Sequence, residues 1–363
     1  MARLDEIFHL QMGKTPSRNH SEYWVDGKNC WVSIADLGTY QKFTSDTKEK
    51  ITDLAVCESG IKCVPENTVI MSFKLSLGKT AITKEPVYTN EAIMAFIPTG
   101  KFEVLPDYFY YVFSGRDWSK DTNRAVMGST LNKVTLSEIS IDVPSLEEQR
   151  KIAAVLDKVS DLIAKRRQQL EKLDELVKSR FIELFGDPER NPKGLPVLPW
   201  HEVFHTTTGK LDSNAMVEGG QYPFFTCAKE NYWIDTYAFD CEALLLAGNN
   251  AAGVYDVKYY KGKFNAYQRT YVLRLINEQW SYKLFKRQLE DKLLYLQRRS
   301  KGTNTRYLTL GILNDLYFMV PPINQQEQFD VFAGRIDKSK LAIQKSLEKL
   351  ETLKKALMQE YFG

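Results

Sequence analysis

The sequence predicts an α+β protein built as a tandem repeat of two mixed α/β domains, each followed by a long α-helix. Three observations predict this fold class: a repeated boundary segment, a coiled-coil pattern after each copy of it, and short β-branched and aromatic runs before it. We expect the first domain at residues 1–143 and its helix at 144–187. The second domain should span 188–320 and its helix 321–363.

The repeat is clearest where each domain passes into its helix. The segment Val143–Gln149, with its Val-Pro pair and its glutamine, recurs 177 positions later as Val320–Gln326. The match continues without a gap to Phe185-Gly186 in the first copy and Phe362-Gly363 in the second. Proline restricts the residue before it and suits a helix start, so both segments predict a sharp entry into a helix.

A second match lies upstream, near the start of each domain. Glu6-Ile-Phe-His9 with Gly13-Lys14 resembles Glu202-Val-Phe-His205 with Gly209-Lys210 at an offset of 196. The second copy is therefore 19 residues shorter, and the difference lies inside the domain. Matching ends around a different middle indicate one scaffold with two different readouts.

Both predicted helices carry apolar residues at alternating spacings of four and three, the pattern of a coiled-coil seam. The seam positions are Leu156, Val159, Ile163, Leu170, Leu173, Val177 and Leu184 in the first helix and Ile336, Ile343, Leu347, Leu350 and Leu357 in the second. Arg166 and Arg180 interrupt the first seam and Lys340 and Lys354 the second, and each aligns with an apolar residue of the other copy. We interpret this complementarity as an antiparallel coiled coil with pseudo-two-fold symmetry. Two independent helices, each docked on its own domain, are the alternative.

Within the domains, the strands are predicted at Trp31–Ile34, Thr68–Met71 and Ala92–Ile97, and in the second copy at Tyr222–Phe225, Ala243–Leu246 and Tyr271–Leu275. Helical stretches are predicted at Leu105–Phe113 and Ser281–Leu296.

Composition narrows the classes of function. No window approaches 18 uncharged apolar residues, which argues against a membrane span. The five cysteines include no C-x-x-C pair and are expected to be reduced thiols, so we expect a cytoplasmic protein. The net charge is only +3, but residues 258–306 hold thirteen Lys or Arg against three acids. A solvated surface is the plain interpretation of that excess, and nucleic-acid binding is the functional one.

In each domain, one loop rich in Gly, Asn, Ser, Lys and Arg follows a buried strand and another precedes the final strand, and such residues can contact phosphates or base edges. The candidate DNA-binding residues are Lys14, Arg18, Lys74, Lys79, Arg124, Ser129 and Lys133 in the first domain and Lys210, Asn249, Asn250, Arg269, Arg298, Arg299, Lys301, Asn304 and Arg306 in the second.

The whole arrangement resembles the specificity subunit of type I restriction-modification systems. The motifs that carry the resemblance are Val143-Pro144 with Gln149, Val320-Pro321 with Gln326, Trp31-Val32 and Gly13. It implies a subunit without catalytic residues, in which two target recognition domains each read half of a bipartite, gapped, double-stranded DNA target. The helices would set the gap and dock two adenine methyltransferase subunits, and motor-nuclease subunits would complete the complex. S-adenosylmethionine and ATP with Mg²⁺ would then belong to those partners, and no cofactor to this chain.

Two alternatives stay open. One is a stand-alone DNA-binding regulator on the same duplicated scaffold. The other is a metal-dependent hydrolase, because His201, Glu202 and His205 match the H-E-x-x-H pattern in which two histidines of one helical face bind zinc. The repeat disfavours the hydrolase, since the equivalent segment begins with Asp5 instead of a histidine. We therefore expect no metal site and no catalytic residue.

Overall fold

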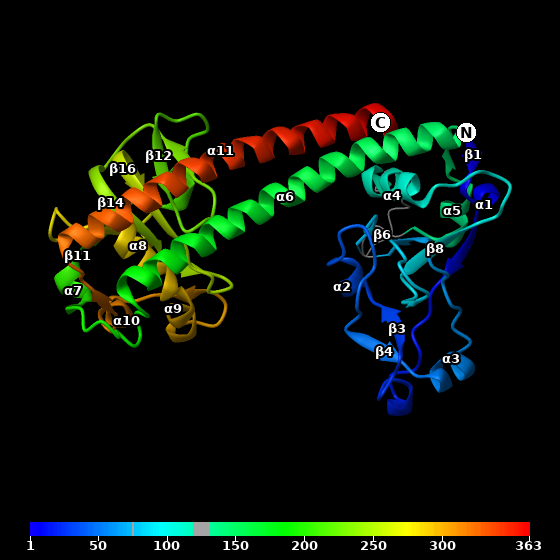
Figure 1. Ribbon diagram of the computed structural model, residues 1–363, viewed down its shortest axis with the longest axis horizontal. Helices are drawn as coiled ribbons and strands as arrows, with labels where there is room; N and C mark the ends of the chain where they lie inside the picture. Colours follow the sequence, from blue (N-terminus) through cyan, green and yellow to red (C-terminus); the bar gives the residue numbers. More distant parts are fainter. Residues whose placement is uncertain (75, 119–130) are drawn as a thin grey trace. The chain divides into compact units, whose positions relative to one another are not determined.

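A computed structural model describes residues 1–74, 76–118 and 131–363. The chain divides into two compact units (Figure 1). Unit 1 contains residues Met1–Arg166 together with Ser346–Gly363, and unit 2 contains Arg167–Lys345. Each unit thus combines one α/β domain with parts of both long helices. The α/β domain predicted before each long helix is confirmed.

The α/β domain of unit 1 holds a four-stranded antiparallel sheet in the order β2-β8-β5-β6 and a three-stranded sheet in the order β4-β3-β7. In the second sheet β3 runs parallel to β7 and antiparallel to β4. The short strands β1 and β9 pair separately. The elements are β1 (Ala2–Arg3), α1 (Leu4–Ile7), β2 (Phe8–Met12), η1 (Ser21–Tyr23), β3 (Asn29–Val32), α2 (Ile34–Leu37), β4 (Glu49–Ile51), α3 (Asp53–Ser59), β5 (Val69–Ser72), β6 (Thr80–Ile82), β7 (Tyr88–Thr89), β8 (Ile93–Pro98), α4 (Pro106–Gly115), α5 (Lys133–Glu138) and β9 (Ser140–Ile141).

The α/β domain of unit 2 is built around one six-stranded sheet in the order β11-β17-β14-β16-β12-β13. Its elements are β10 (Val197–Pro199), α7 (Trp200–Val203), β11 (Phe204–Thr208), η3 (Ser213–Ala215), β12 (Tyr222–Phe225), β13 (Tyr232–Ile234), β14 (Phe239–Ala247), β15 (Asn249–Asn250), β16 (Val257–Ala266), β17 (Thr270–Leu275), α8 (Tyr282–Asp291), α9 (Leu293–Arg299), β18 (Arg306–Tyr307), α10 (Leu310–Asn314) and β19 (Tyr317–Met319).

The strands of the two α/β domains are arranged in the same order. Strands β2-β8-β5-β6 followed by β7-β3-β4 in unit 1 correspond to β11-β17-β14-β16-β12-β13 in unit 2. The difference lies at one place, where the single ten-residue strand β16 stands for the two short strands β6 and β7. The repeat seen at the edges of each domain therefore extends through its sheet, and the domains differ in how the middle of the sheet is interrupted.

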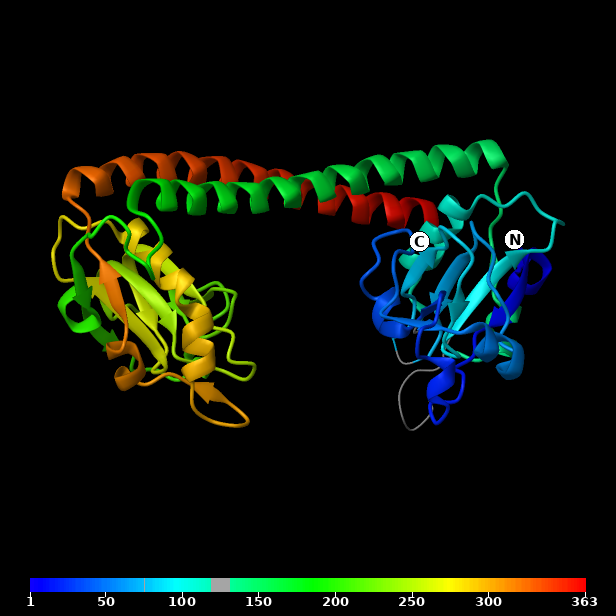
Figure 2. The same cartoon turned by 60° about the horizontal axis from the view of Figure 1, so that its bottom comes forward.

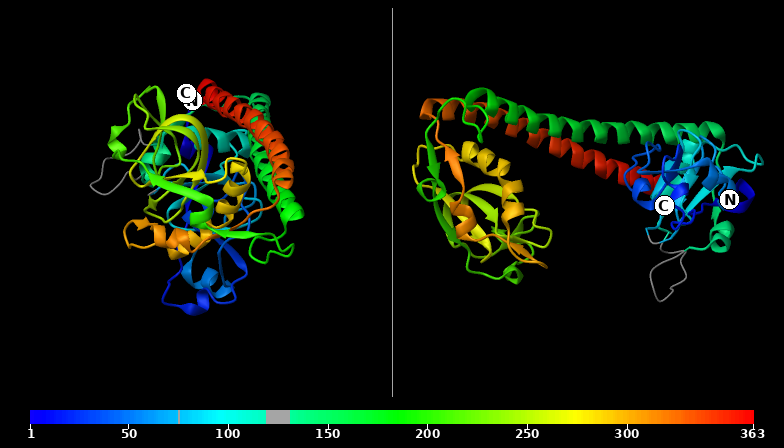
Figure 3. Two further views of the ribbon diagram at one scale, coloured as in Figure 1. Left: turned by 90° about the vertical axis from the view of Figure 1, so that its left-hand side faces the viewer. Right: turned by 90° about the horizontal axis from the view of Figure 1, so that it is seen from below.

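The long helices α6 (Leu146–Phe185) and α11 (Ile323–Phe362) pair in antiparallel orientation (Figures 1 and 3). In unit 2, the ring of Phe329 near the start of α11 lies 5.8 Å from that of Phe181 and 5.9 Å from that of Phe185, both at the end of α6. In unit 1, the end of α11 contacts α4, with the Phe362 ring 5.6 Å from Tyr108. The antiparallel pair predicted from the heptads is confirmed.

The contacts made by the basic seam residues differ from those that the sequence comparison suggested. Lys340 forms an ion pair with Asp174. The guanidinium of Arg180 lies 5.8 Å from the ring centroid of Phe332. In an antiparallel pair of helices, residues that the repeat aligns face each other only near the centre of the pair. The alignment of basic with apolar residues therefore identified the wrong contact partners. All of the predicted seam positions are buried or half-buried.

The helix predicted at Ser281–Leu296 is instead two helices. Helix α8 ends at Asp291 and α9 begins at Leu293, with Lys292 between them. The backbone N–H of Lys292 donates to Leu289 O at 3.1 Å, a tightened bond that closes the first helix. The side chain of Lys292 lies over Phe318, 5.5 Å from its ring centroid, and its burial lowers the pKa of the lysine. The amphipathic pattern continues across this break and therefore does not reveal it.

The glycine of each Gly-Lys pair stands where two backbones approach closely. A Cβ added to Gly209 would lie 1.8 Å from Ala266 O, at the end of β16. A Cβ on Gly13 would lie 2.2 Å from Thr89 O, at the end of β7. At each glycine the chain thus passes close to the backbone at the end of another strand, where a Cβ does not fit, and this explains why both copies have glycine there.

Replacing Gly209 with alanine is expected to lower the free energy of unfolding by about 2–3 kcal/mol, because the methyl group meets a backbone carbonyl that side-chain motion cannot relieve. Gly311 in α10 is the matched control, since its added Cβ would meet only Thr309 Oγ1 at 3.7 Å. Urea unfolding should show Gly311→Ala unchanged or slightly more stable. Equal stability of the two variants would contradict the steric role.

Candidate nucleic-acid interface

In unit 2, two loops are joined by the short strands β15 and β18. Asn249 pairs with Tyr307 and Asn250 with Arg306. The backbone N–H of Gly248, just before β15, donates to Arg269 O at 2.8 Å, and a Cβ there would lie 2.2 Å from that oxygen. The β15–β18 pair lies at the end of unit 2 away from the long helices (Figure 2). Three segments distant in sequence therefore converge at one end of the sheet.

Cationic side chains from these segments are exposed at this place. Arg269, Arg298 and Lys301 are all exposed, and Lys301 is held by a bridge to Tyr307. Lys210 is also exposed. It lies near Arg269, because the backbone N–H of Gln268 donates to Leu211 O at 2.9 Å and joins the loop of Lys210 to the turn that bears Arg269. Asn304, in the loop before β18, is also exposed. We name the set Lys210, Arg269, Arg298 and Lys301 the basic end of unit 2.

Two further predicted residues of unit 2 have structural partners. Arg306 is half-buried, packs against Gly253 and donates through Nη1 to Gln297 O at 3.1 Å. Arg299 lies 3.6 Å from Asp315 in an exposed ion pair, the kind that contributes little to stability. Arg306 therefore supports the loop more than it faces solvent, whereas Arg299 keeps an accessible guanidinium.

In unit 1, Lys14 and Arg18 belong to the segment beside the smaller sheet. Lys14 Nζ donates to Ser59 O at 2.5 Å. Arg18 binds Glu49 through both guanidinium Nη atoms, at 2.5 and 2.9 Å, and lies 3.7 Å over the Trp24 ring. The hydrogen bond from Arg18 lowers the pKa of Glu49. The guanidinium of Arg18 thus already has a carboxylate and an aromatic face as partners.

The other predicted residues of unit 1 are held by different segments. Lys74 and Lys79 lie between β5 and β6, and Lys133 begins α5. The two segments meet where Leu131 N–H donates to Phe73 O at 3.1 Å. Lys79 and Lys133 are exposed, and Lys74 is half-buried with its Nζ 5.1 Å from the Phe73 ring centroid. Arg124 and Ser129 lie outside the described residues.

The H-E-x-x-H segment does not have the geometry that zinc binding by this motif needs. His201 and Glu202 lie in the four-residue helix α7, whereas His205 is in strand β11. The two histidines therefore do not share one helical face. Among the residues that the structure describes, no three His, Cys, Asp or Glu side chains gather as a metal ion would require. Within the same residues, no helix is long and apolar enough to cross a membrane.

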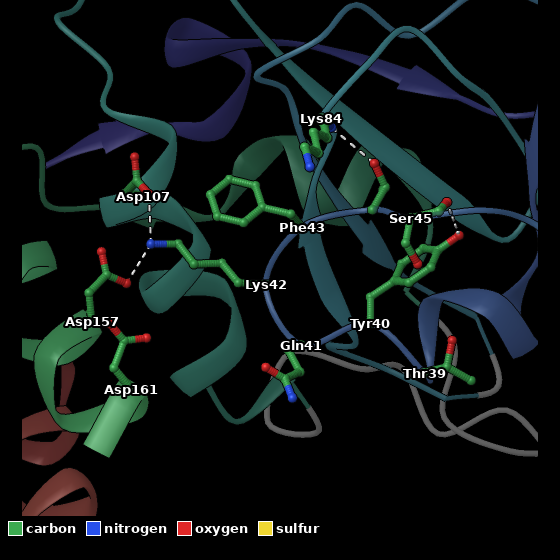
Figure 4. Close-up of a pocket in the computed structure, with 11 residues that line it drawn as sticks. Thr39, Tyr40, Gln41, Lys42, Phe43, Ser45, Lys84, Asp107, Asp157 and Asp161 are labelled. Atoms are coloured by element: carbon green, nitrogen blue, oxygen red, sulfur yellow. Dashed lines mark hydrogen bonds and ion pairs between the residues drawn. The ribbon is translucent and has the colours of Figure 1, made fainter. Parts of the chain in front are cut away.

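A large pocket of about 860 Å³ lies in unit 1, where the α/β domain meets α6 (Figure 4). Its central residue is Lys42, whose Nζ is 2.6 Å from Asp107 Oδ1 and 2.5 Å from Asp157 Oδ1. Tyr111 donates its hydroxyl to the same Asp157 oxygen at 2.7 Å, and burial together with this bond raises the pKa of Tyr111. The sequence analysis did not identify Lys42, because its partners Asp107 and Asp157 are far from it in the sequence.

Lys42 joins the segment between α2 and β4 to both α4 and α6, so its replacement should act on stability. Lys42→Met keeps the aliphatic stem but leaves two carboxylates close together, and we expect the free energy of unfolding to fall by about 2–3 kcal/mol. Lys84→Met is the control, because Lys84 lines the same pocket with an exposed side chain. Thermal unfolding at neutral pH measures both variants. If Lys42→Met is no less stable than Lys84→Met, this role is wrong.

The duplicated sheet, the paired helices and the loops at the ends of the sheets can be compared with known proteins. The family model described as type I restriction modification DNA specificity domain matches residues 1–173 and 193–355. The chain belongs to this family. It is thus the DNA specificity component of a type I restriction-modification system. Members of this family are the non-catalytic component of the complex.

Relatives cover nearly the whole chain. The MjaIX specificity subunit of Methanocaldococcus jannaschii is 26% identical over 401 residues, which cover 98% of this chain and 90% of that protein. The EcoprrI specificity subunit of Escherichia coli is 24% identical over 364 residues and covers 92% and 86%. The solved S subunit from M. genitalium has a TM-score of 0.65 at 15% identity, with coverage of 100% and 95%. At this identity the structural likeness shows the shared fold alone.

Proposed function

We propose that the α/β domain of each unit reads one half of a bipartite, gapped DNA target, and that the paired helices set the length of the gap. One observation carries this proposal: the strands of the two α/β domains have the same order, but the loops at the ends of these strands differ. A shared scaffold holds each domain in an equivalent place, whereas different loops offer different groups to the bases. The two half-sites should therefore differ in sequence.

The basic end of unit 2 supports contact with DNA at one half-site. Exposed Lys and Arg residues neutralise phosphates, and Asn or Arg side chains beside them can bind purine edges through two hydrogen bonds. Asn249 and Asn250 lie on β15 next to this cluster. For unit 1, the proposed contacts are Lys79 and Lys133, together with Arg124 and Ser129.

The proposed partners follow from the family. Two adenine methyltransferase subunits would dock on the paired helices, and motor-nuclease subunits would join for cleavage. Those subunits would bring S-adenosylmethionine and ATP with Mg²⁺. One solved relative, a chain from a study of complex assembly in the type I R-M system, has a TM-score of 0.53 at 17% identity and supports the fold of this subunit only.

Methylation mapping tests the function directly. DNA exposed to the chain in complex with its methyltransferase should carry methyl groups at a target with two defined half-sites and an undefined gap. Exchange of the loops around Arg299 and Arg306 should alter one half-site, and exchange around Arg124 and Lys133 the other. Loss spread evenly over both half-sites would contradict the division of labour. Failure to form a complex with the methyltransferase would instead favour the stand-alone regulator.

A further inference from the structure

Two buried glutamines occupy the same position in the two units. Gln149 is the fourth residue of α6 and Gln326 the fourth residue of α11. Their side chains are 0% and 1% exposed, respectively. A buried primary amide carries a carbonyl oxygen and two N–H groups that need partners, because an unsatisfied one costs free energy. The bonds that these amides make therefore show what each glutamine holds in place.

In unit 1, Gln149 joins three segments. Its Oε1 accepts from the backbone N–H of Leu105, the residue that precedes α4, at 2.8 Å. Its Nε2 donates to Pro144 O and to Glu103 O, both at 2.9 Å. Leu105 caps α4 without a side-chain hydrogen bond of its own. The glutamine thus ties the start of α4 to the linker and to the first turn of α6.

Unit 2 repeats this junction. Gln326 Oε1 accepts from the N–H of Ser281, the residue that precedes α8, at 2.9 Å. Its Nε2 donates to Pro321 O at 2.8 Å. The hydroxyl of Ser281 also donates to Asp330, about one turn further along α11. The same three kinds of segment therefore meet at an equivalent glutamine, although the helices that they connect differ in sequence.

We propose that Gln149 and Gln326 are positioning residues that fix the direction in which each long helix leaves its α/β domain, and thereby hold the DNA gap to one length. The planar amide satisfies all its partners in one arrangement. Rotation of the helix against the domain would break these bonds and leave a buried polar group without a hydrogen-bond partner. This inference rests on the proposed function. One base pair changes the separation of two half-sites by about 3.4 Å and their relative rotation by about 35°, so a loosened junction should accept targets one base pair too long or too short.

The test compares Gln326→Leu with Gln288→Leu, and Gln149→Leu serves as a second positioning variant. Gln288 is 1% exposed and makes two matching backbone bonds, to Met319 O at 2.9 Å and from Met319 N–H at 2.8 Å. Its bonds, however, lie within the α/β domain. Gln326→Leu and Gln288→Leu thus each lose two buried hydrogen bonds, but only Gln326→Leu loses bonds that hold a long helix to its domain.

Methylation rates should be measured for the complexes on DNA with the mapped gap and with gaps one base pair longer or shorter. We expect the preference for the correct gap to fall about tenfold in Gln326→Leu and Gln149→Leu, which corresponds to the loss of roughly one net hydrogen bond. The bases of both half-sites and the preference in Gln288→Leu should stay unchanged. If all three variants lose rate but keep the wild-type gap preference, the positioning role is wrong.

A second measurement is independent of DNA and of the methyltransferase. Spin labels at the exposed residues Asp240 in β14 and Lys338 in α11, both in unit 2, report how the domain sits on the helix. Their distance distribution should broaden in Gln326→Leu and stay narrow in Gln288→Leu; an unchanged distribution in Gln326→Leu overturns the inference. If the wild-type complex methylates no gapped target, the proposed function fails while the spin labels still decide the positioning role. Gln326→Met, of similar volume, replaces Gln326→Leu if that variant does not fold.

Discussion

Replacing Arg269, Arg298 and Lys301 together with alanine is expected to weaken DNA binding by roughly a hundredfold or more at physiological salt. The three side chains are exposed at the basic end of unit 2. Each cation that neutralises a phosphate releases about one counterion, so the slope of log affinity against log salt should also become shallower by nearly three. Titration of the chain, without partner subunits, with labelled target DNA at several salt concentrations measures both effects.

The matched control for this triple variant removes three exposed lysines from the long helices of the same unit: Lys172, Lys338 and Lys345. The net charge changes equally in both variants, so a general electrostatic effect would weaken binding to the same extent. We expect the control to retain most of its affinity and its salt slope. Equal losses in the two variants would show that unit 2 has no specific basic surface at this end of the sheet.

Replacing Phe329 with alanine should lower the free energy of unfolding by about 3–5 kcal/mol, the range for a large buried aromatic side chain. Phe329 is 1% exposed, and its ring packs against those of both Phe181 and Phe185. It therefore contributes both to the core of unit 2 and to the pairing of α11 with α6. Chemical denaturation and scanning calorimetry should each show the loss in the free energy of unfolding.

Val331 provides the control for Phe329, because it lies on the same helix with 58% of its side chain exposed. Val331→Ala should change the free energy of unfolding by no more than about 0.5 kcal/mol. A large loss in both variants would mean that shortening any apolar side chain of α11 unfolds the helix. A small loss in Phe329→Ala would mean that the helices pair weakly.

Much of the fold could be predicted from spacing along the chain. The two matches at offsets of 177 and 196 predicted the duplication, and the alternating spacing predicted the long helices. Each match joins several residues of two segments, and the four-three spacing recurs along each helix, so neither signal depends on a single position. The antiparallel pairing was also predicted, although the contacts of Lys340 and Arg180 correct the reasoning about which residues meet.

The candidate site was harder to predict. Exposed Lys and Arg in loops were expected to contact DNA, but Arg18 proves to be bound to Glu49 and stacked on Trp24, and Arg306 supports its own loop. Composition does not distinguish a free cation from one that is already paired. Lys42 was missed entirely, since Asp107 and Asp157 become its partners only where α4 and α6 pack beside it in the folded unit.

The sequence by itself determined the duplication, the two long helices and the apolar character of their seams, because these depend on residue type and on spacing within one segment. Only the tertiary structure decided which segments meet. It joined β15 to β18 and packed the end of α11 against the core of unit 1. It also brought Gln149 and Gln326 to the N-termini of α4 and α8. Such contacts join positions far apart in the chain, and they follow from strand order and packing, which local spacing does not specify.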